Sequence, residues 1–114
     1  MRATEIRLSK DKRLLTVGFD TGHVYQMSAE LLRVESPSAE VQGHDPSQKK
    51  LITGKRNVAI TTIEPVGNYA VRLVFDDGHE TGIYSWDVLQ RLGSEAEALF
   101  ETYLEKLNAA GQSR

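Results

Sequence analysis

The feature of this chain that most restricts its fold is a run of strictly alternating side chains near its middle. Every second residue from Tyr69 to Phe75 is large and apolar, and a period of two places such residues on one face of a β-strand. Turn-forming residues flank the run, with Gly67-Asn68 before it and Asp76-Asp77-Gly78 after it. The segment therefore predicts a β-strand that tight turns join to a further strand on either side.

Several shorter stretches repeat this pattern and are expected to form the remaining strands. They are residues 6–8, 15–19, 24–27, 58–66 and 81–84. Asp20-Thr21-Gly22 separates the second and third stretches and has the composition of a hairpin turn. Because strands and helices do not alternate along the chain, we expect a mainly antiparallel sheet and no doubly wound fold.

Three helices are expected from capping signals. Ser28 and Ser85 can each accept a backbone N–H bond at the start of a helix, and Gly93 is expected to stop the second helix. Ser94 and Glu97 have the spacing of a capping box, which predicts the start of the third helix. Apolar residues at helical spacing then continue to residue 107, so this last helix is expected to be amphipathic.

Length and pattern together predict the domain organisation. A chain of 114 residues fits one domain. We expect residues 1–107 to form this domain and residues 108–114 to form a flexible tail. The predicted fold class is α+β, with a mainly antiparallel β-sheet, short helices and a C-terminal amphipathic helix.

Charge and composition argue against several classes of function. A formal net charge of -2 and a pI of about 5.9 provide no overall positive field for nucleic acid. No apolar stretch approaches the roughly 20 residues that span a bilayer, and the charged N-terminus lacks the apolar segment of a signal peptide. The absence of cysteine excludes disulfides and thiolate metal sites. We therefore expect a cytoplasmic protein that binds neither nucleic acid nor membranes.

Between residues 34 and 57 the alternating pattern breaks, and a long loop is expected there. A loop of this length is either functional or disordered. Its second half holds the basic residues of the region, which are Lys49, Lys50, Lys55 and Arg56. Gly54 can let backbone N–H groups converge on an anion. These four residues are therefore candidates for contact with an anion or an acidic partner.

His79 and His44 are the histidines whose neighbours suit metal or proton chemistry. His44 precedes Asp45, and His79 lies beside Asp77 and Glu80 in the sequence. Nitrogen and oxygen ligands suit iron or zinc, so His79, His44 and Asp77 are candidate metal ligands. The simpler interpretation is that both histidines are turn residues that bond to nearby backbone. No residues form a complete catalytic set, so the chain is not expected to be an enzyme.

Four stretches resemble the gamma-butyrobetaine hydroxylase-like N-terminal domain family. They are residues 36–44, 54–58, 63–71 and 75–86, and the similarity extends over about residues 4 to 93. The resemblance implies a bacterial stand-alone domain of unknown function. In the hydroxylases this domain precedes a catalytic domain that uses iron and 2-oxoglutarate. The residues after 93 are too few for such a domain, so the catalytic activity is not expected to transfer.

The resemblance also implies a zinc site and its loss. The hydroxylase version of the domain holds a structural zinc through three cysteines and a histidine. The cysteine positions correspond here to Ser36, Ser38 and Val41, and the histidine position corresponds to His79. Because hydroxyls are poor zinc ligands and valine cannot ligate, the zinc site is predicted to be absent and no cofactor is expected.

These observations leave two hypotheses of different classes. The first is a non-catalytic accessory module that engages a protein partner through the 42–57 loop and the surface around His79 and Tyr84. The resemblance suggests an iron- and 2-oxoglutarate-dependent enzyme as the partner, or iron–sulfur assembly machinery, because related plant domains are fused to iron–sulfur scaffold ATPases of the Mrp type. The alternative is an iron- or zinc-binding protein that uses His79 with His44 and nearby carboxylates. A homodimer formed through an exposed sheet edge is a third option.

Overall fold

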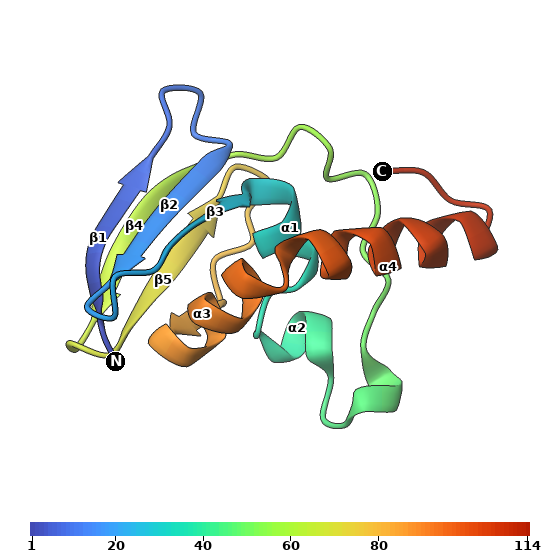
Figure 1. The fold of residues 1–114 in the computed structure, drawn as a ribbon. Helices are drawn as coiled ribbons and strands as arrows, with labels where there is room; N and C mark the ends of the chain where they lie inside the picture. The colour runs from blue at the N-terminus through green and yellow to red at the C-terminus, as the bar shows by residue number, and fades with distance from the viewer.

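The computed structural model describes residues 1–114 and contains two three-stranded antiparallel sheets. The first sheet holds β1 (Ala3–Leu8), β2 (Leu14–Phe19) and β3 (Val24–Ser28) in that order. The second holds β4 (Ile60–Val66), β5 (Ala70–Phe75) and β6 (Ile83–Ser85). The helices are α1 (Ala29–Val34), α2 (Ala39–Gln42), the 3-10 helix η1 (Pro46–Gln48), α3 (Trp86–Ser94) and α4 (Ala96–Ala109). The predicted α+β fold with mainly antiparallel strands and a C-terminal helix is confirmed (Figure 1).

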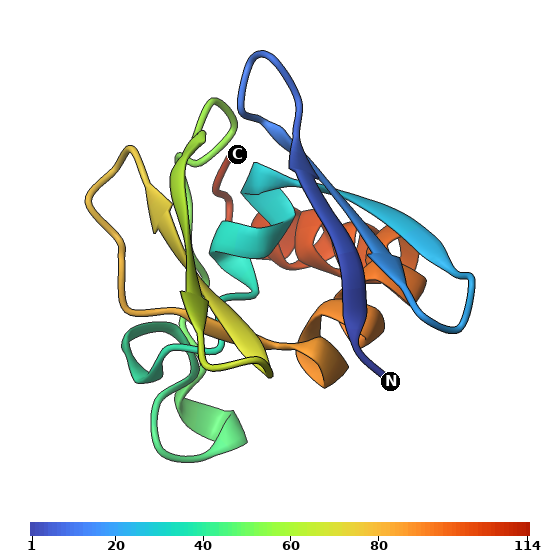
Figure 2. The same cartoon turned by 90° about the vertical axis from the view of Figure 1, so that its left-hand side faces the viewer.

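The helices cover the open side between the two sheets (Figures 1 and 2). One core cluster of 15 buried apolar residues joins both sheets to α1 and α3. Leu15 and Leu73 come from the central strand of each sheet, and Leu32 of α1 and Leu89 of α3 pack against them with no exposed surface. Each sheet therefore buries one face against the same helices, which makes the whole chain one packed unit. No helix combines the length and the apolar character needed to cross a membrane.

The β4–β5 hairpin is the strand pair that the sequence predicted most clearly. Val66 pairs with Ala70, and Gly67 takes a φ of 55° in the turn between them. That positive φ is readily adopted by glycine because it has no Cβ. Tyr69 lies in the turn and is 58% exposed, so the strand begins one residue later than the alternation predicted.

The end of α3 differs from the prediction that Gly93 stops the helix. The helix continues to Ser94, and Gly93 lies inside it. A Cβ at Gly93 would lie 2.5 Å from the Cβ of Tyr25 on β3. The glycine is therefore required by close packing between helix and strand, a contact that the local sequence does not reveal.

The predicted capping box at the start of α4 is wrong. Ser94 belongs to α3, and its hydroxyl donates to the carbonyl of Arg91 at 3.3 Å. Glu95 is the N-cap residue and makes no side-chain capping bond. Only Glu95 separates the two helices. Its backbone N–H donates to the carbonyl of Arg91 in α3, and its own carbonyl accepts the first helical bond of α4 from the N–H of Leu99.

The C-terminal boundary also differs from the expected one at residue 107. The helix α4 runs to Ala109, and Arg114 then folds back to form an ion pair with Glu30 at 2.6 Å. The long loop before β4 contains α2 and η1, whose caps are Ser38 and Asp45. Short helical turns thus interrupt a region that the sequence predicted as irregular.

Candidate functional site

Two segments far apart in the sequence, the segment after α1 and the loop between β5 and β6, meet in a polar cluster whose centre, Ser36 and His79, is buried. The Ser36 hydroxyl lies 2.9 Å from Nε2 of His79, and the Glu40 carboxylate lies 3.0 Å from Nδ1 of the same ring. The hydroxyls of Ser38 and Thr81 are 2.6 Å apart. We call these five residues the serine–histidine cluster. His79 is only 6% exposed at its centre.

The environment of His79 favours its neutral form. Burial lowers the pKa of His79, and the positive charge of Arg33 lowers it further, against the opposing effect of Glu40 and Asp77. A neutral imidazole has one donor nitrogen and one acceptor nitrogen. The partners assign these roles: Nδ1–H donates to Glu40, and Nε2 accepts from the Ser36 hydroxyl.

The order of serine hydroxyl, imidazole and carboxylate in this cluster is also that of hydrolytic triads. Ser36 is fully buried, however, and its hydroxyl also accepts from the backbone N–H of Ser38 at 3.3 Å. The chain packs so tightly there that a Cβ at Gly82 would lie 2.6 Å from the Ser36 Oγ. A serine nucleophile needs free space in front of its oxygen for a substrate carbonyl. The cluster therefore fastens two loops together and does not present a nucleophile.

Asp77 forms a second polar group beside this cluster. Its Oδ2 contacts Arg33 Nε at 2.8 Å and Lys55 Nζ at 2.6 Å, and its Oδ1 accepts from the backbone N–H of His79 at 3.0 Å. Burial alone would raise the pKa of Asp77, but the hydrogen bonds from Lys55, His79 and Arg33 outweigh it and lower the pKa to about 2. One nitrogen of Arg33, Nη1, is buried without a hydrogen-bond partner.

The positions implied for a zinc site lie within this region. Ser36 and His79 are in direct contact, Ser38 is bonded to Ser36, and Val41 is buried in the adjoining helix α2. The donor set is unsuitable for zinc, because it offers two hydroxyls, an aliphatic side chain and an imidazole whose two nitrogens already have partners. The residues present therefore do not fit zinc, and hydrogen bonds hold the two loops where a metal is implied in the family.

The three predicted metal ligands are not brought together. His44 lies in the exposed stretch between α2 and η1, where its backbone N–H donates to the Gln48 side chain at 2.7 Å. Asp77 is held by two cations, and His79 is held by Ser36 and Glu40. No group of three or more His, Cys, Asp or Glu side chains is arranged to hold a metal ion. The grouping of His79, His44 and Asp77 expected from the sequence is therefore not formed.

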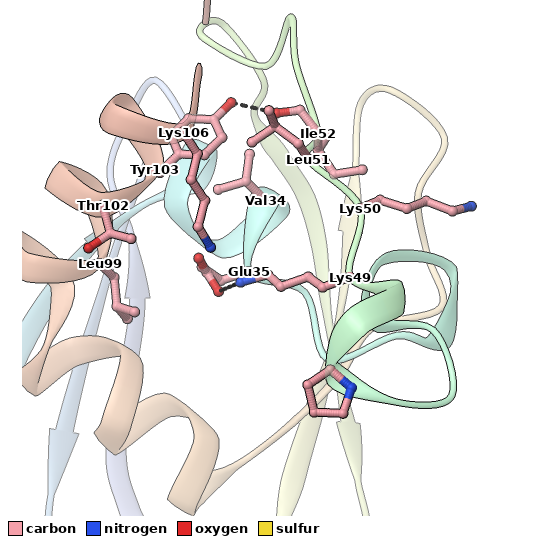
Figure 3. Close-up of a pocket in the computed structure, with 11 residues that line it drawn as sticks. Val34, Glu35, Lys49, Lys50, Leu51, Ile52, Leu99, Thr102, Tyr103 and Lys106 are labelled. Carbon is pink, nitrogen blue, oxygen red and sulfur yellow. Dashed lines mark hydrogen bonds and ion pairs between the residues drawn. The ribbon is translucent and has the colours of Figure 1, made fainter. Parts of the chain in front are cut away.

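A second candidate site is the cleft between residues 49–52 and α4 (Figure 3). Its volume is about 310 Å³, near the lower end of the range for ligand pockets. The apolar residues that line it are Val34, Leu51, Ile52, Leu99 and Tyr103. The Tyr103 hydroxyl donates to the carbonyl of Ile52 at 2.6 Å and so ties the loop to the helix. Burial raises the pKa of Tyr103, which keeps this donor protonated.

Some charged residues of the cleft form ion pairs and others do not. Glu35 is the one acidic residue lining it, and Lys49 Nζ lies 2.6 Å from its carboxylate. Lys106 reaches from α4 into the same space, whereas Lys50 points away from the cavity (Figure 3). Lys106 and Lys50 are both exposed, and neither takes part in an ion pair within the chain. The rim of the cleft therefore carries positive charge that the chain does not neutralise.

The four basic residues predicted as a binding patch divide into two kinds. Lys49 and Lys55 are paired with Glu35 and Asp77, and they hold the loop against the rest of the molecule. Lys50 and Arg56 are exposed and form no ion pair. Only this second pair is free to contact another molecule.

Tyr84 is not part of any surface, so its prediction as a partner contact is wrong. Its side chain has no exposed area, and its hydroxyl donates to the backbone carbonyl of Leu32. Burial raises the pKa of Tyr84 well above its usual value. The residue is a core side chain because the alternation in β6 turns Tyr84 inward and leaves Ile83 48% exposed.

Glu35, Tyr103 and Lys106 are among the residues of the cleft that were not predicted from the sequence. The spacing of Tyr103 and Lys106 places them on one face of the C-terminal helix, which is the signal that could have found them. Glu35 follows a six-residue helix and has no local signal. Its role depends on Lys49, which is 14 residues away.

Comparison with known proteins gives one consistent family. Residues 6–90 match the family described as gamma-butyrobetaine hydroxylase-like, N-terminal. One solution NMR structure is 53% identical with a TM-score of 0.85, covering 99% of this chain and 84% of that chain. Another is 44% identical with a TM-score of 0.84, covering 99% and 89%.

A crystal structure is also similar to this chain, at a lower sequence identity. It is that of a protein of unknown function of the DUF971 family from Acidithiobacillus ferrooxidans ATCC 23270, and it is 39% identical to this chain. Its TM-score is 0.69, with 82% of this chain and 94% of that chain covered. No curated protein matches the chain in a sequence search.

Proposed function

This chain belongs to the gamma-butyrobetaine hydroxylase-like, N-terminal family, and from that premise we propose that it is a non-catalytic accessory module that binds a protein partner. The binding surface is the cleft between residues 49–52 and α4, with its basic rim. The partner is an iron- and 2-oxoglutarate-dependent enzyme or a component of iron–sulfur assembly, since related domains are joined to such proteins. We place this interaction in the cytoplasm.

The observation that carries the proposal is the combination of an apolar wall with unneutralised lysines. Leu51 is 36% exposed at the edge of the cleft, and Leu99 and Ile52 line its interior. Lys106 and Lys50 add positive charge beside this wall, because Glu35 is already paired with Lys49. A surface with an apolar centre and a charged rim is typical of protein interfaces.

The chemistry of the cleft specifies the partner's segment. It requires an apolar side chain to fill the space beside Leu99 and an adjacent carboxylate to pair with Lys106. Complementary charge at such a rim mainly increases the association rate and selects the partner. Apolar burial in the centre supplies the larger share of the affinity.

Photo-crosslinking from within the cleft tests the proposal. The chain carrying the photoreactive residue benzoylphenylalanine in place of Leu51 is expressed in bacterial cells, irradiated and purified, and its adducts are identified by mass spectrometry. We expect an adduct with one protein of the stated class. Reversing the two free lysines, Lys50→Glu with Lys106→Glu, is expected to lower adduct yield and the affinity of the purified pair by about ten-fold or more.

A charge reversal away from the cleft provides the matched control. Lys10→Glu changes an exposed lysine in the β1–β2 turn that forms no ion pair, and it is expected to leave the adduct unchanged. Equal adduct yield from the cleft variant and this control would show that the cleft is not the interface. Turnover of a substrate by the purified chain alone would contradict the non-catalytic role.

A further inference from the structure

Three arginines from separate parts of the chain line one hollow that the proposed partner cleft does not include. Arg13 precedes β2, Arg56 lies in the loop before β4, and Arg114 is the last residue of the sequence. The hollow has a volume of about 270 Å³. Figures 1 and 2 show the C-terminal end beside the segment that leads into β4, and this arrangement brings Arg56 and Arg114 to one place.

Arg114 is held in a fixed orientation. Its Nε lies 3.2 and 3.1 Å from the two carboxylate oxygens of Glu30, and its Nη2 lies 2.6 Å from one of them. The guanidinium also lies over the ring of Phe100, with its carbon 5.1 Å from the centroid. Glu30 is 4% exposed, and Arg114 is the cation that pairs with its carboxylate.

The other two arginines have no such partner. Arg13 and Arg56 are exposed and take part in no ion pair. Three arginine side chains therefore line the hollow, and its one acidic side chain, Glu30, is already paired with Arg114. Like charges that share one hollow repel one another, and an anion bound between them relieves this repulsion.

The chemistry of the lining identifies the class of anion. Guanidinium groups present planar pairs of N–H donors that match the oxygens of a phosphate group. A phosphate group carries a charge of about -1.5 to -2 at pH 7, so it is attracted to the two guanidinium groups that have no carboxylate partner. Lys55, which the sequence placed beside Arg56 in the same patch, is instead held by Asp77.

We propose that the hollow lined by Arg13, Arg56 and Arg114 is a binding site for a phosphate group. Arg56 and Arg13 contact the oxygens directly, and Arg114 contributes from its position on Glu30 and Phe100. The phosphate is either the free ion or the terminal group of a small phosphomonoester. Neither hydrolysis nor transfer of the group is part of this proposal.

Nuclear magnetic resonance of the ¹⁵N-labelled chain in a phosphate-free buffer tests the site. Inorganic phosphate and phenyl phosphate are titrated separately at constant ionic strength, with sodium acetate as the comparison anion. We expect saturable shifts of the Arg13, Arg56 and Arg114 signals with both phosphates and little change with acetate. Tighter binding of phenyl phosphate identifies a phosphomonoester as the ligand class, whereas equal or tighter binding of inorganic phosphate identifies the free ion.

Variants of the two unpaired arginines locate the binding. Arg13→Gln and Arg56→Gln are each expected to weaken phosphate binding about ten-fold, because each removes a charge-assisted hydrogen bond. Lys10→Gln is the matched control and is expected to leave binding unchanged. Both arginines are exposed, so the variants should keep the melting temperature of the parent chain, which is measured alongside. Shifts that fail to saturate, that acetate reproduces, or that persist when Arg13→Gln and Arg56→Gln are combined would overturn the proposal.

Discussion

Two regions of the molecule differ in whether their charged side chains have partners. One is the serine–histidine cluster with its neighbour Asp77, and the other is the hollow lined by arginines. In the first region, Arg33 pairs with Asp77, and the buried His79 bonds to Ser36 and Glu40. In the second, Arg13 and Arg56 remain exposed without a carboxylate. The difference indicates that the first region stabilises the fold, whereas the second is available for binding.

The largest expected effect concerns Asp77, whose removal leaves two cations without a partner. Asp77→Asn is expected to lower the free energy of unfolding by about 2–3 kcal/mol, because Arg33 and Lys55 are left partly buried and unpaired. Urea denaturation measures the change. Glu101→Gln, which removes an exposed carboxylate on α4, is expected to change it by less than about 0.5 kcal/mol.

The pH dependence of the same contact gives an independent check. The pKa of Asp77 is lowered from 3.8 to about 2 in the folded chain. Its contribution to stability is therefore present above about pH 4 and is lost as the pH falls towards 2. If Asp77→Asn retained the whole acid sensitivity of the parent chain, the ion pairs would not contribute as described.

The next effect concerns His79, whose pKa is lowered from 6.5 in the folded chain. The unfolded chain then binds more protons than the folded chain just below pH 6.5, so the free energy of unfolding falls as the pH decreases from that value. His79→Asn is expected to cost about 1–2 kcal/mol at pH 7.5 through lost bonds to Ser36 and Glu40. It is also expected to reduce the pH dependence just below pH 6.5.

The exposed His23 provides the comparison for this experiment. It lies exposed in the β2–β3 turn, away from Ser36 and Glu40, so His23→Asn is the control for replacing a histidine outside the cluster. Denaturation in urea at a series of pH values measures both variants. An unchanged slope in His79→Asn would mean that the buried imidazole is not the group that titrates.

The smallest expected effect concerns the two unpaired arginines. Changing both Arg13 and Arg56 to Gln is expected to alter the free energy of unfolding by no more than about 0.5 kcal/mol. The direction at low ionic strength is stabilising, because repulsion within the hollow is reduced, and added salt should remove the gain. Urea denaturation at two salt concentrations measures it. A loss of more than about 1 kcal/mol would show that these arginines stabilise the fold and would remove the contrast between the two regions.

Much of the secondary structure could be predicted from local pattern, because its causes are local. The alternation before Phe75 identified β5, and the hydroxyls of Ser28 and Ser85 identified the starts of α1 and α3. The prediction failed at Gly93, where the deciding contact is with Tyr25 in a distant strand. Local signals locate elements well until a tertiary contact overrides them.

The candidate sites were only partly predictable for the same reason. Lys49, Lys50, Lys55 and Arg56 form one patch in the sequence, yet two of them are paired and two are free. The partner of Lys55 is 22 residues away along the chain, and that of Lys49 is 14 residues away. A list of charges cannot distinguish these cases, because pairing depends on which carboxylate the fold brings within reach.

The sequence by itself determined the family, the α+β class and the positions of most strands, since alternation and turn chemistry act between neighbouring residues. The tertiary structure alone decided that Tyr84 is buried and that Arg13 and Arg114 line one hollow. It also decided that His79 bonds to Ser36 and does not join His44 in a metal site. These outcomes depend on the packing of two sheets against shared helices. That packing brings together segments that are far apart in the chain, and neighbouring residues carry no signal of such contacts.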